Sequence, residues 1–154
     1  MSAESRLTEL GITLPPVPKA AGLYAPLVQT GNLVFIAGQV PVVDGKPASL
    51  GKCGDAVSIE HGAELARQCS LQALALVRAH LGTLDRVVSV PRVAGYVAAA
   101  PGFTDAPLVV NGASQVLLDL FGEPGRHARV AIGVAELPLN VPVEVEYLFE
   151  VSAG

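Results

Sequence analysis

The sequence predicts an α+β domain, and three observations support that class. The chain has the length of one domain, with 154 residues of which 51% are hydrophobic. Apolar runs of strand length alternate with two helical segments, and two helices can cover only one face of a sheet of that size. No internal repeat, low-complexity tract or linker divides the chain. We therefore expect a single domain over residues 1–154, with residues 1–20 as an N-terminal extension packed on it.

The first half of the chain contains the strongest helical pattern. From Ser58 onward, small and apolar residues recur at steps of three and four, and Gly82 can end the helix that Ser58 caps. So many alanines on that face would let the helix lie close against a sheet. The elements predicted here are a short helix (Ser2–Leu10), an extended proline-rich segment (14–18), a strand (Leu33–Val40), a hairpin turn (Asp44-Gly45) and the long helix (Ser58–Leu81).

The second half predicts a mixed sheet with one more helix. Within its first strand, Pro91 indicates either an edge position or a bulge. In its last strand, Glu144 and Glu146 share one face, opposite a row of apolar side chains. The sheet face without helices must be covered by something, and another copy of the chain is the natural candidate. The predicted elements are a strand (Arg86–Ala99), a helix (Pro107–Phe121) and two strands (His127–Ala135 and Val141–Val151).

Composition excludes several classes of protein. The net charge of −4 and ten scattered basic residues argue against a nucleic-acid binder. No stretch is long and apolar enough for a membrane span, and the polar N-terminus has no signal-peptide block, so we expect a cytoplasmic protein. Cys53 and Cys69 make no disulfide framework, have no metal-ligand spacing with the histidines and lack the electropositive setting of a reactive thiol. We expect no metal, no cofactor and no catalytic cysteine.

Two charged residues inside apolar strands are the candidate functional side chains. Arg129 lies in His-Ala-Arg-Val-Ala-Ile, and Glu144 lies in Val-Pro-Val-Glu-Val-Glu. Both could simply face solvent on an open sheet face. Alternatively, a guanidinium can grip a carboxylate through two parallel hydrogen bonds, while a nearby glutamate handles protons or positions water. Strand periodicity alone does not say whether Glu144 or Glu146 would be the functional acid.

Three segments in series resemble the reactive intermediate deaminase (Rid/YjgF) family. The resemblance covers roughly residues 14–151, in order and with near-family spacing. The segments are Gly22-Leu-Tyr24 with Gly31-Asn32 and Ile36-Ala-Gly-Gln-Val-Pro41, then Val110-Asn111, and finally the C-terminal run from His127 through Leu137-Pro138 to Val143-Glu-Val-Glu146.

That resemblance implies a fold, an assembly and an activity. The family fold is a chorismate-mutase-like (YjgF-like) α+β domain, with a mixed sheet and two helices on one face, and three copies pack their sheets into a trimeric barrel with clefts between subunits. The implied reaction is hydrolysis of enamine or imine intermediates of amino acids to 2-keto acids and ammonia. By position, Arg129 matches the arginine that holds the carboxylate of the small substrate, and Glu144 the acid that positions or activates water. Tyr24, Gly38 and Asn111 match residues that line the cleft.

Two positions depart from the family pattern. Ala37 stands where well-characterised deaminases carry a serine, and Ala131 where many carry a cysteine, so two polar contacts are absent and the substrate need not be the smallest imine. Two alternative functions stay open. One is a non-catalytic module that binds a keto acid or another carboxylate in the same cleft, and the other is an endoribonuclease, which the charge and the lack of a histidine pair disfavour. Asn111 could instead bond its local backbone, and Gly38 could serve only to let two strands approach closely.

Overall fold

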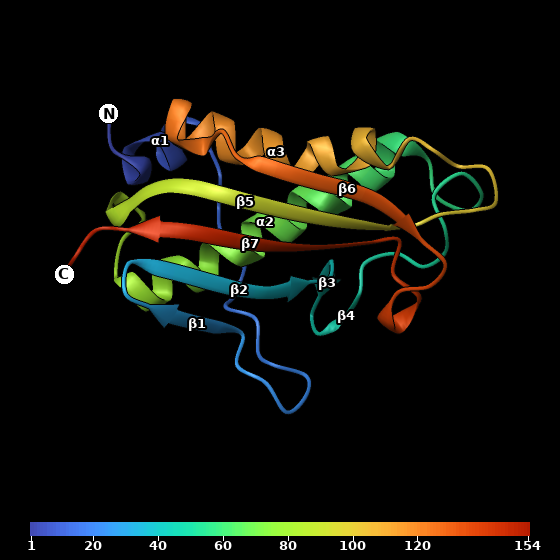
Figure 1. Cartoon of the computed structure of the whole chain (residues 1–154), viewed down its shortest axis with the longest axis horizontal. Coiled ribbons are helices and arrows are strands. Elements are labelled where there is room, and N and C mark those ends of the chain that lie inside the picture. Colours follow the sequence, from blue (N-terminus) through green and yellow to red (C-terminus); the bar gives the residue numbers. More distant parts are fainter.

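A computed structural model describes all residues, 1–154, and contains one five-stranded sheet with helices on one of its faces (Figure 1). The predicted α+β class with a mixed sheet is confirmed. Strands β5 and β6 run parallel and all other neighbours are antiparallel. In sheet order, the strands are β1 (Leu27–Thr30), β2 (Leu33–Gln39), β7 (Val143–Val151), β5 (Val87–Ala98) and β6 (Ala128–Val134).

The helices begin and end where the sequence places their caps. Helix α2 (Ile59–Leu81) starts at Ser58, whose Oγ accepts a hydrogen bond from the His61 N–H, and ends at Gly82 in a left-handed conformation. Helix α3 (Ala106–Phe121) has proline in its first turn and stops at Gly122. The short helix α1 (Ala3–Glu9) is capped by Ser2. All three predicted helices are therefore present.

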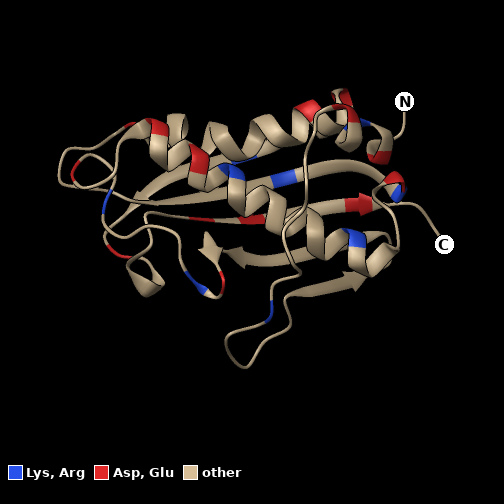
Figure 2. Ribbon diagram, turned by 180° about the vertical axis from the view of Figure 1, so that it is seen from behind, with Lys and Arg blue, Asp and Glu red and all other residues tan.

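Seen from behind, α2 and α3 lie side by side across the sheet, with acidic and basic residues interspersed along both layers (Figure 2). Their close contact depends on Gly112 in α3, because a Cβ atom there would overlap the backbone carbonyl of Ala63 in α2. Leu7 of α1 is buried in the same core. None of these helices combines the length and apolar character needed to cross a bilayer.

The sheet departs from the sequence prediction at two strands. Strand β1 was not predicted, and it pairs with β2 to form one sheet edge. Pro91 lies at a register shift of β5 between Ser89 and Arg92, so the bulge alternative is right. The edge alternative is wrong, because β5 is paired on both sides, with β7 and β6. The predicted turn at Asp44-Gly45 joins β3 (Val42–Val43) to β4 (Lys46–Pro47), a small hairpin outside the main sheet.

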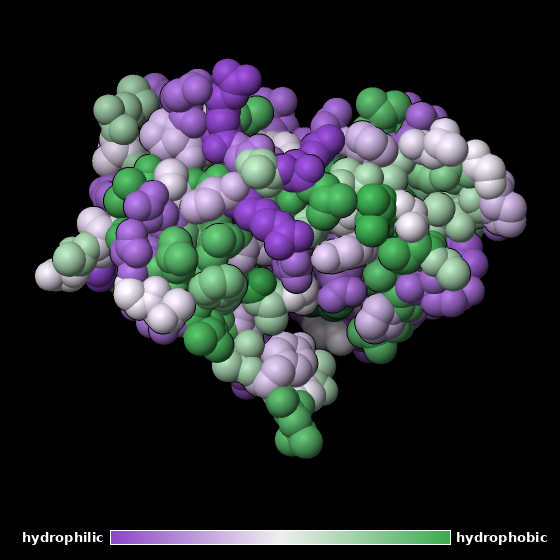
Figure 3. Space-filling model, viewed as in Figure 1, coloured by the Kyte–Doolittle hydropathy of each residue, from purple (hydrophilic) through white to green (hydrophobic).

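The two faces of the sheet differ in burial. On the helix side, the alternate β7 residues Val143, Val145 and Tyr147 are buried in the core. On the other side no element of the chain covers the sheet, and Phe35 of β2 is 46% exposed. The space-filling view of this open face shows apolar residues on both sides of a hydrophilic band (Figure 3). The expected one-sided helix cover is confirmed.

Candidate functional site

Arg129 lies on the edge strand β6 and faces α3 rather than the open face. On β5 Arg129 pairs with Val93, which is buried in the core on the helix side. Paired residues point to the same face of a sheet, so the Arg129 side chain also points to the helix side. The guanidinium donates from Nη1 to Asn111 Oδ1 (2.8 Å) and Ser114 Oγ (3.1 Å), and from Nη2 to the Pro107 carbonyl (3.3 Å). A guanidinium has five N–H donors, so Nε–H and one Nη2–H remain without a partner in the chain. These two donors are available to an external acceptor.

Asn111 is therefore the predicted site residue that the fold brings to Arg129. Its side-chain oxygen accepts from Arg129 instead of bonding the local backbone, which was the alternative that the sequence left open. Ser114 and His127 also belong to this group, since Ser114 Oγ lies 2.8 Å from His127 Nε2. Sequence reasoning missed both. The signals were present, because Ser114 follows Asn111 by one helical turn and His127 precedes Arg129 by one strand repeat.

Glu144 lies on the open face, on the central strand β7. It is opposite Tyr96 of β5, and its carboxyl group fills the space beside Gly38, where a Cβ atom would overlap Glu144 Oε1. The structure thus brings Gly38 and Glu144 together, and a side chain at position 38 would displace the carboxyl group from this place. Burial, and secondly the charge of Glu146, raise the pKa of Glu144 above its ordinary value. A carboxyl group of this kind exchanges a proton nearer neutral pH than an exposed one.

Glu146 has a different environment from Glu144. Its Oε1 accepts a hydrogen bond from the Tyr96 hydroxyl at 3.4 Å. It also lines a small hollow on the open face with Phe35 and Arg92. Glu146 is therefore already bonded within the chain, whereas no hydrogen bond to Glu144 is present. This difference favours Glu144 as the acid that is free to act on a ligand.

Within one chain these residues form separate groups. Arg129 lies two strands away from Glu144 and three residues further along the sheet, so their Cα atoms are roughly 14 Å apart. Their side chains point to opposite faces of the sheet. Tyr24 lies in the segment before β1, the strand at the other edge of the sheet, and is half exposed. Its hydroxyl accepts only a long bond, 3.4 Å, from the Ala21 N–H. One subunit alone does not assemble the five predicted residues into one cleft.

Neither cysteine has the setting of a reactive thiol. Cys53 and Cys69 are fully buried, and burial raises the pKa of each thiol. A thiol in that setting is a poor nucleophile. No group of three or more His, Cys, Asp or Glu side chains is arranged to hold a metal ion.

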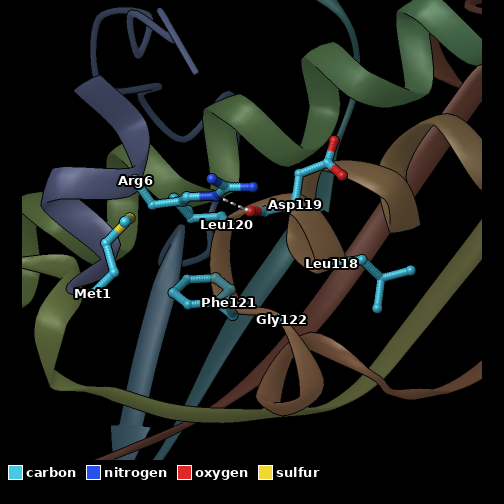
Figure 4. A pocket seen from close by; sticks show the side chains of 7 residues that line it. All are labelled: Met1, Arg6, Leu118, Asp119, Leu120, Phe121 and Gly122. Atoms are coloured by element: carbon cyan, nitrogen blue, oxygen red, sulfur yellow. Dashed lines mark hydrogen bonds between the residues drawn. The ribbon is translucent and has the colours of Figure 1, made fainter. Parts of the chain in front are cut away.

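A separate hollow of about 330 Å³ lies between α1 and the end of α3 (Figure 4). Arg6 reaches across it, but Nε of Arg6 already donates to the Asp119 carbonyl and its Nη1 pairs with Glu9. The rest of the lining is largely apolar, including Met1 and Phe121, and none of the predicted site residues contributes to it. We therefore place the candidate site at Arg129 and Glu144 rather than here.

Comparison with known proteins identifies the class of protein that this fold and site define. The family described as "YjgF/chorismate mutase-like, putative endoribonuclease" matches residues 4–151. The chain belongs to this YjgF/Rid family. It is 40% identical to Protein TCP17 of Trypanosoma cruzi over 149 residues, 96% of this chain and 93% of that one.

Two further relatives extend the likeness. A 2-iminobutanoate/2-iminopropanoate deaminase of Dermatophagoides farinae is 30% identical over 136 residues, which span 88% of this chain and 91% of that one. The crystal structure of a protein of Shewanella oneidensis, described as "a putative endoribonuclease", superposes with a TM-score of 0.93 at 32% identity, covering 98% of this chain and all of that one. The resemblance inferred from the sequence motifs is confirmed at the level of the family.

Proposed function

We propose that the protein hydrolyses enamine or imine intermediates of amino acids to 2-keto acids and ammonia, in a cleft between the subunits of a homotrimer. The observation that carries the proposal is the guanidinium of Arg129. Three contacts to α3 hold it in place, and two of its N–H groups remain unpaired. Two parallel donors match the two oxygens of a carboxylate, which every 2-imino acid carries. The deaminase name among the relatives supports the same substrate class.

The separation of the site residues supports an assembly of several copies. Arg129 lies at the β6 edge, and Tyr24 precedes β1, the strand at the opposite edge. Glu144 faces out from the open side of the sheet. A second copy packed against that open side can bring residues from different edges to one interface, which no movement within a single sheet could do. The exposed apolar residues of the open face favour the same arrangement.

The proposed reaction uses one acid and one water molecule. Arg129 of one subunit holds the carboxylate, and Glu144 of a neighbouring subunit takes a proton from water as the oxygen of that water adds to the C=N carbon. The same carboxyl group then returns that proton to the nitrogen, which gives a carbinolamine. Glu144 next takes the proton of the new hydroxyl group and passes it to the nitrogen, the C=O bond forms as the C–N bond breaks, and a 2-keto acid and ammonia leave. A carboxyl group whose pKa is raised by burial suits this exchange, because it holds a proton more readily than an exposed carboxyl group does.

The test is a screen of imines generated in situ by an amino-acid oxidase, with release of keto acid and ammonia measured above the spontaneous rate. Arg129→Ala should lose this acceleration. Arg126→Ala is the matched control, because Arg126 is exposed and pairs only with Glu123, at 3.7 Å. Equal acceleration by Arg129→Ala and the wild-type protein would refute the proposal.

The non-catalytic alternative rests on Ala37 and Ala131, where the absence of two polar groups leaves the pocket less equipped for chemistry. It predicts that a 2-keto acid binds while no imine is turned over. The endoribonuclease alternative has the descriptions of relatives in its favour and the acidic net charge against it. It predicts RNA cleavage that survives removal of contaminating nucleases and is lost in Arg129→Ala.

A further inference from the structure

A chain of hydrogen bonds lies behind Arg129 and joins it to the end of the preceding turn. Arg129 Nη1 contacts Ser114 Oγ at 3.1 Å, and Ser114 Oγ contacts His127 Nε2 at 2.8 Å. On the far side of the ring, His127 Nδ1 lies 2.7 Å from the carbonyl oxygen of Gly125. Three elements contribute: α3, the short 3₁₀ turn η2 (Glu123–Gly125), and the residue that immediately precedes β6.

The donors and acceptors of this chain allow only one polarity for a neutral ring. The carbonyl of Gly125 can only accept, so His127 Nδ1 carries the hydrogen and donates it. Nε2 is then an acceptor, and the Ser114 hydroxyl donates to it. The lone pairs of Ser114 Oγ consequently face Arg129, whose Nη1 can only donate. Each group in the chain meets a complementary partner.

The setting of His127 favours the neutral ring that this polarity requires. The pKa of His127 is lowered, chiefly by burial. The hydrogen bond to Gly125 opposes this shift, and the positive charge of Arg129 adds to it. Ser114 is only 9% exposed, so water competes little for its hydroxyl. Near neutral pH the hydrogen bonds are therefore all donated in one direction, from Arg129 through Ser114 and His127 to Gly125.

We infer that Ser114 and His127 are positioning residues that orient the Arg129 guanidinium for one planar carboxylate. This inference rests on the proposed role of Arg129 and deepens it. Asn111 and Ser114 occupy both hydrogens of Nη1, and the Pro107 carbonyl occupies one of Nη2. The donors left over are Nε–H and one Nη2–H. A ligand thus meets a defined pair of donors instead of a freely rotating cation, and the site selects a monocarboxylate held in one orientation.

A serine bonded to a histidine could also be a nucleophile with its base. The geometry disfavours that role here, because Ser114 is buried within α3 and its oxygen is already engaged by Arg129. The two roles differ in kinetics. Loss of a nucleophile lowers kcat at saturating substrate, whereas loss of a positioning contact mainly raises KM and Kd.

The experiment measures 2-ketobutyrate affinity by calorimetry, together with kcat and KM for the best imine, in Ser114→Ala, His127→Phe and His127→Gln. We expect Ser114→Ala and His127→Phe to weaken affinity about 5- to 10-fold, the equivalent of one lost hydrogen bond, with kcat nearly unchanged. His127→Gln should recover part of the affinity, because its amide oxygen can accept from Ser114. His80→Phe is the matched control, since His80 is an exposed histidine bonded to Gln29.

A second measurement is independent of any substrate. Nitrogen-15 NMR of the His127 ring at pH 7.5 should show a neutral ring protonated on Nδ1, and a ring protonated on Nε2 would overturn the inference. Wild-type affinity in folded Ser114→Ala and His127→Phe would also overturn it while leaving the proposed function intact, provided that Arg129→Ala has lost binding. If Arg129→Ala binds as well as wild type, the proposed function itself fails. A fall in kcat with unchanged KM in Ser114→Ala would assign the nucleophile role instead.

Discussion

At the scale of single residues, the free donors of Arg129 determine how strongly a carboxylate can bind. Truncation in Arg129→Ala removes a charge-assisted pair, which costs on the order of 2–5 kcal/mol in a desolvated cleft, so the Kd for 2-ketobutyrate should rise about 30-fold or more. Arg129→Lys should recover only part of this, because a point charge cannot reproduce the planar fork or bond Asn111, Ser114 and Pro107 together. Calorimetry measures both. Unchanged affinity in Arg129→Ala would contradict a carboxylate site.

Glu144 should affect turnover rather than binding. Glu144→Gln keeps the shape of the side chain beside Gly38 but removes its ability to take a proton. We expect ligand affinity to be nearly retained while imine hydrolysis falls about 100-fold. Glu146→Gln tests the neighbouring acid, which is bonded to Tyr96 and acts on Glu144 only through its charge, so it should lower turnover far less than Glu144→Gln. If Glu146→Gln lost turnover and Glu144→Gln kept it, the two roles would have to be exchanged.

The raised pKa of Glu144 also predicts how stability depends on pH. A carboxyl group with a higher pKa in the folded than in the unfolded protein contributes stability at low pH, and this is lost as pH rises through the folded pKa. Glu144→Gln has no such loss. It should therefore be more stable than wild type at neutral pH, and the difference should shrink as pH falls toward the ordinary glutamate value of 4.5. Urea unfolding at several pH values measures it. A difference that widens toward low pH would contradict the assigned cause.

Sequence patterns identified the charged residues of the candidate site better than they identified the groups supporting them. Arg129 and Glu144 stood out because charges are rare in apolar strands. Ser114 and His127 did not, since a serine in a helix and a histidine before a strand are ordinary. Ser114 and His127 come into contact only when the fold places the start of β6 beside α3. The sequence also could not predict that Arg129 and Glu144 point to opposite faces of the sheet, because this depends on how β6 and β7 are aligned across β5.

At the scale of elements, the contact between α2 and α3 depends on the absence of a side chain at Gly112. Gly112→Ala would normally favour a helix, yet its Cβ would overlap the Ala63 carbonyl, a backbone group that cannot rotate away. We expect a loss of about 1–3 kcal/mol in the free energy of unfolding. Gln115→Ala is the control on the same helix, because its exposed side chain bonds only Asp119. Equal stability of Gly112→Ala and wild type would show that the helices can separate at little cost.

The elements that sequence predicted well are those with a strong period or a clear cap. Helices α1, α2 and α3 each carry such signals, and β2, β6 and β7 are dense apolar runs. Strand β1 has only four residues, one of them Gln29, and it exists because β2 offers an edge with which to pair. The place of β5 in the interior of the sheet, between β7 and β6, was also not predictable locally. Pro91 has no N–H to donate to a neighbouring strand. An interior strand tolerates it there because Pro91 lies at a bulge, where regular pairing is already interrupted.

At the scale of the whole molecule, the structure has one closed side and one open side. The helices bury the apolar residues of one sheet face, while Val28, Phe35 and Ile132 remain about half exposed on the other. Only 16% of the residues are charged, so few charged side chains are present to make such an apolar face favourable in water. The same face contains Glu144, and both of its edges contain residues of the candidate site. The side chain of Arg129 faces α3 and can be reached only at the β6 edge. If neighbouring copies meet along these edges, covering the open face and completing the site occur in one event.

This link predicts that a change on the open face far from the chemistry disrupts both assembly and activity. Phe35→Glu places a charge in the middle of the proposed interface, and because Phe35 is 46% exposed in the single chain, the fold itself should survive. Sedimentation at micromolar concentration should give a trimer for the wild-type protein and a monomer for Phe35→Glu, with near-native circular dichroism and no imine hydrolysis. Leu118→Glu is the control, since Leu118 is 36% exposed on α3, on the helix side. A wild-type monomer, or a Phe35→Glu monomer with full activity, would show that one subunit suffices and that the cleft between subunits is not the site.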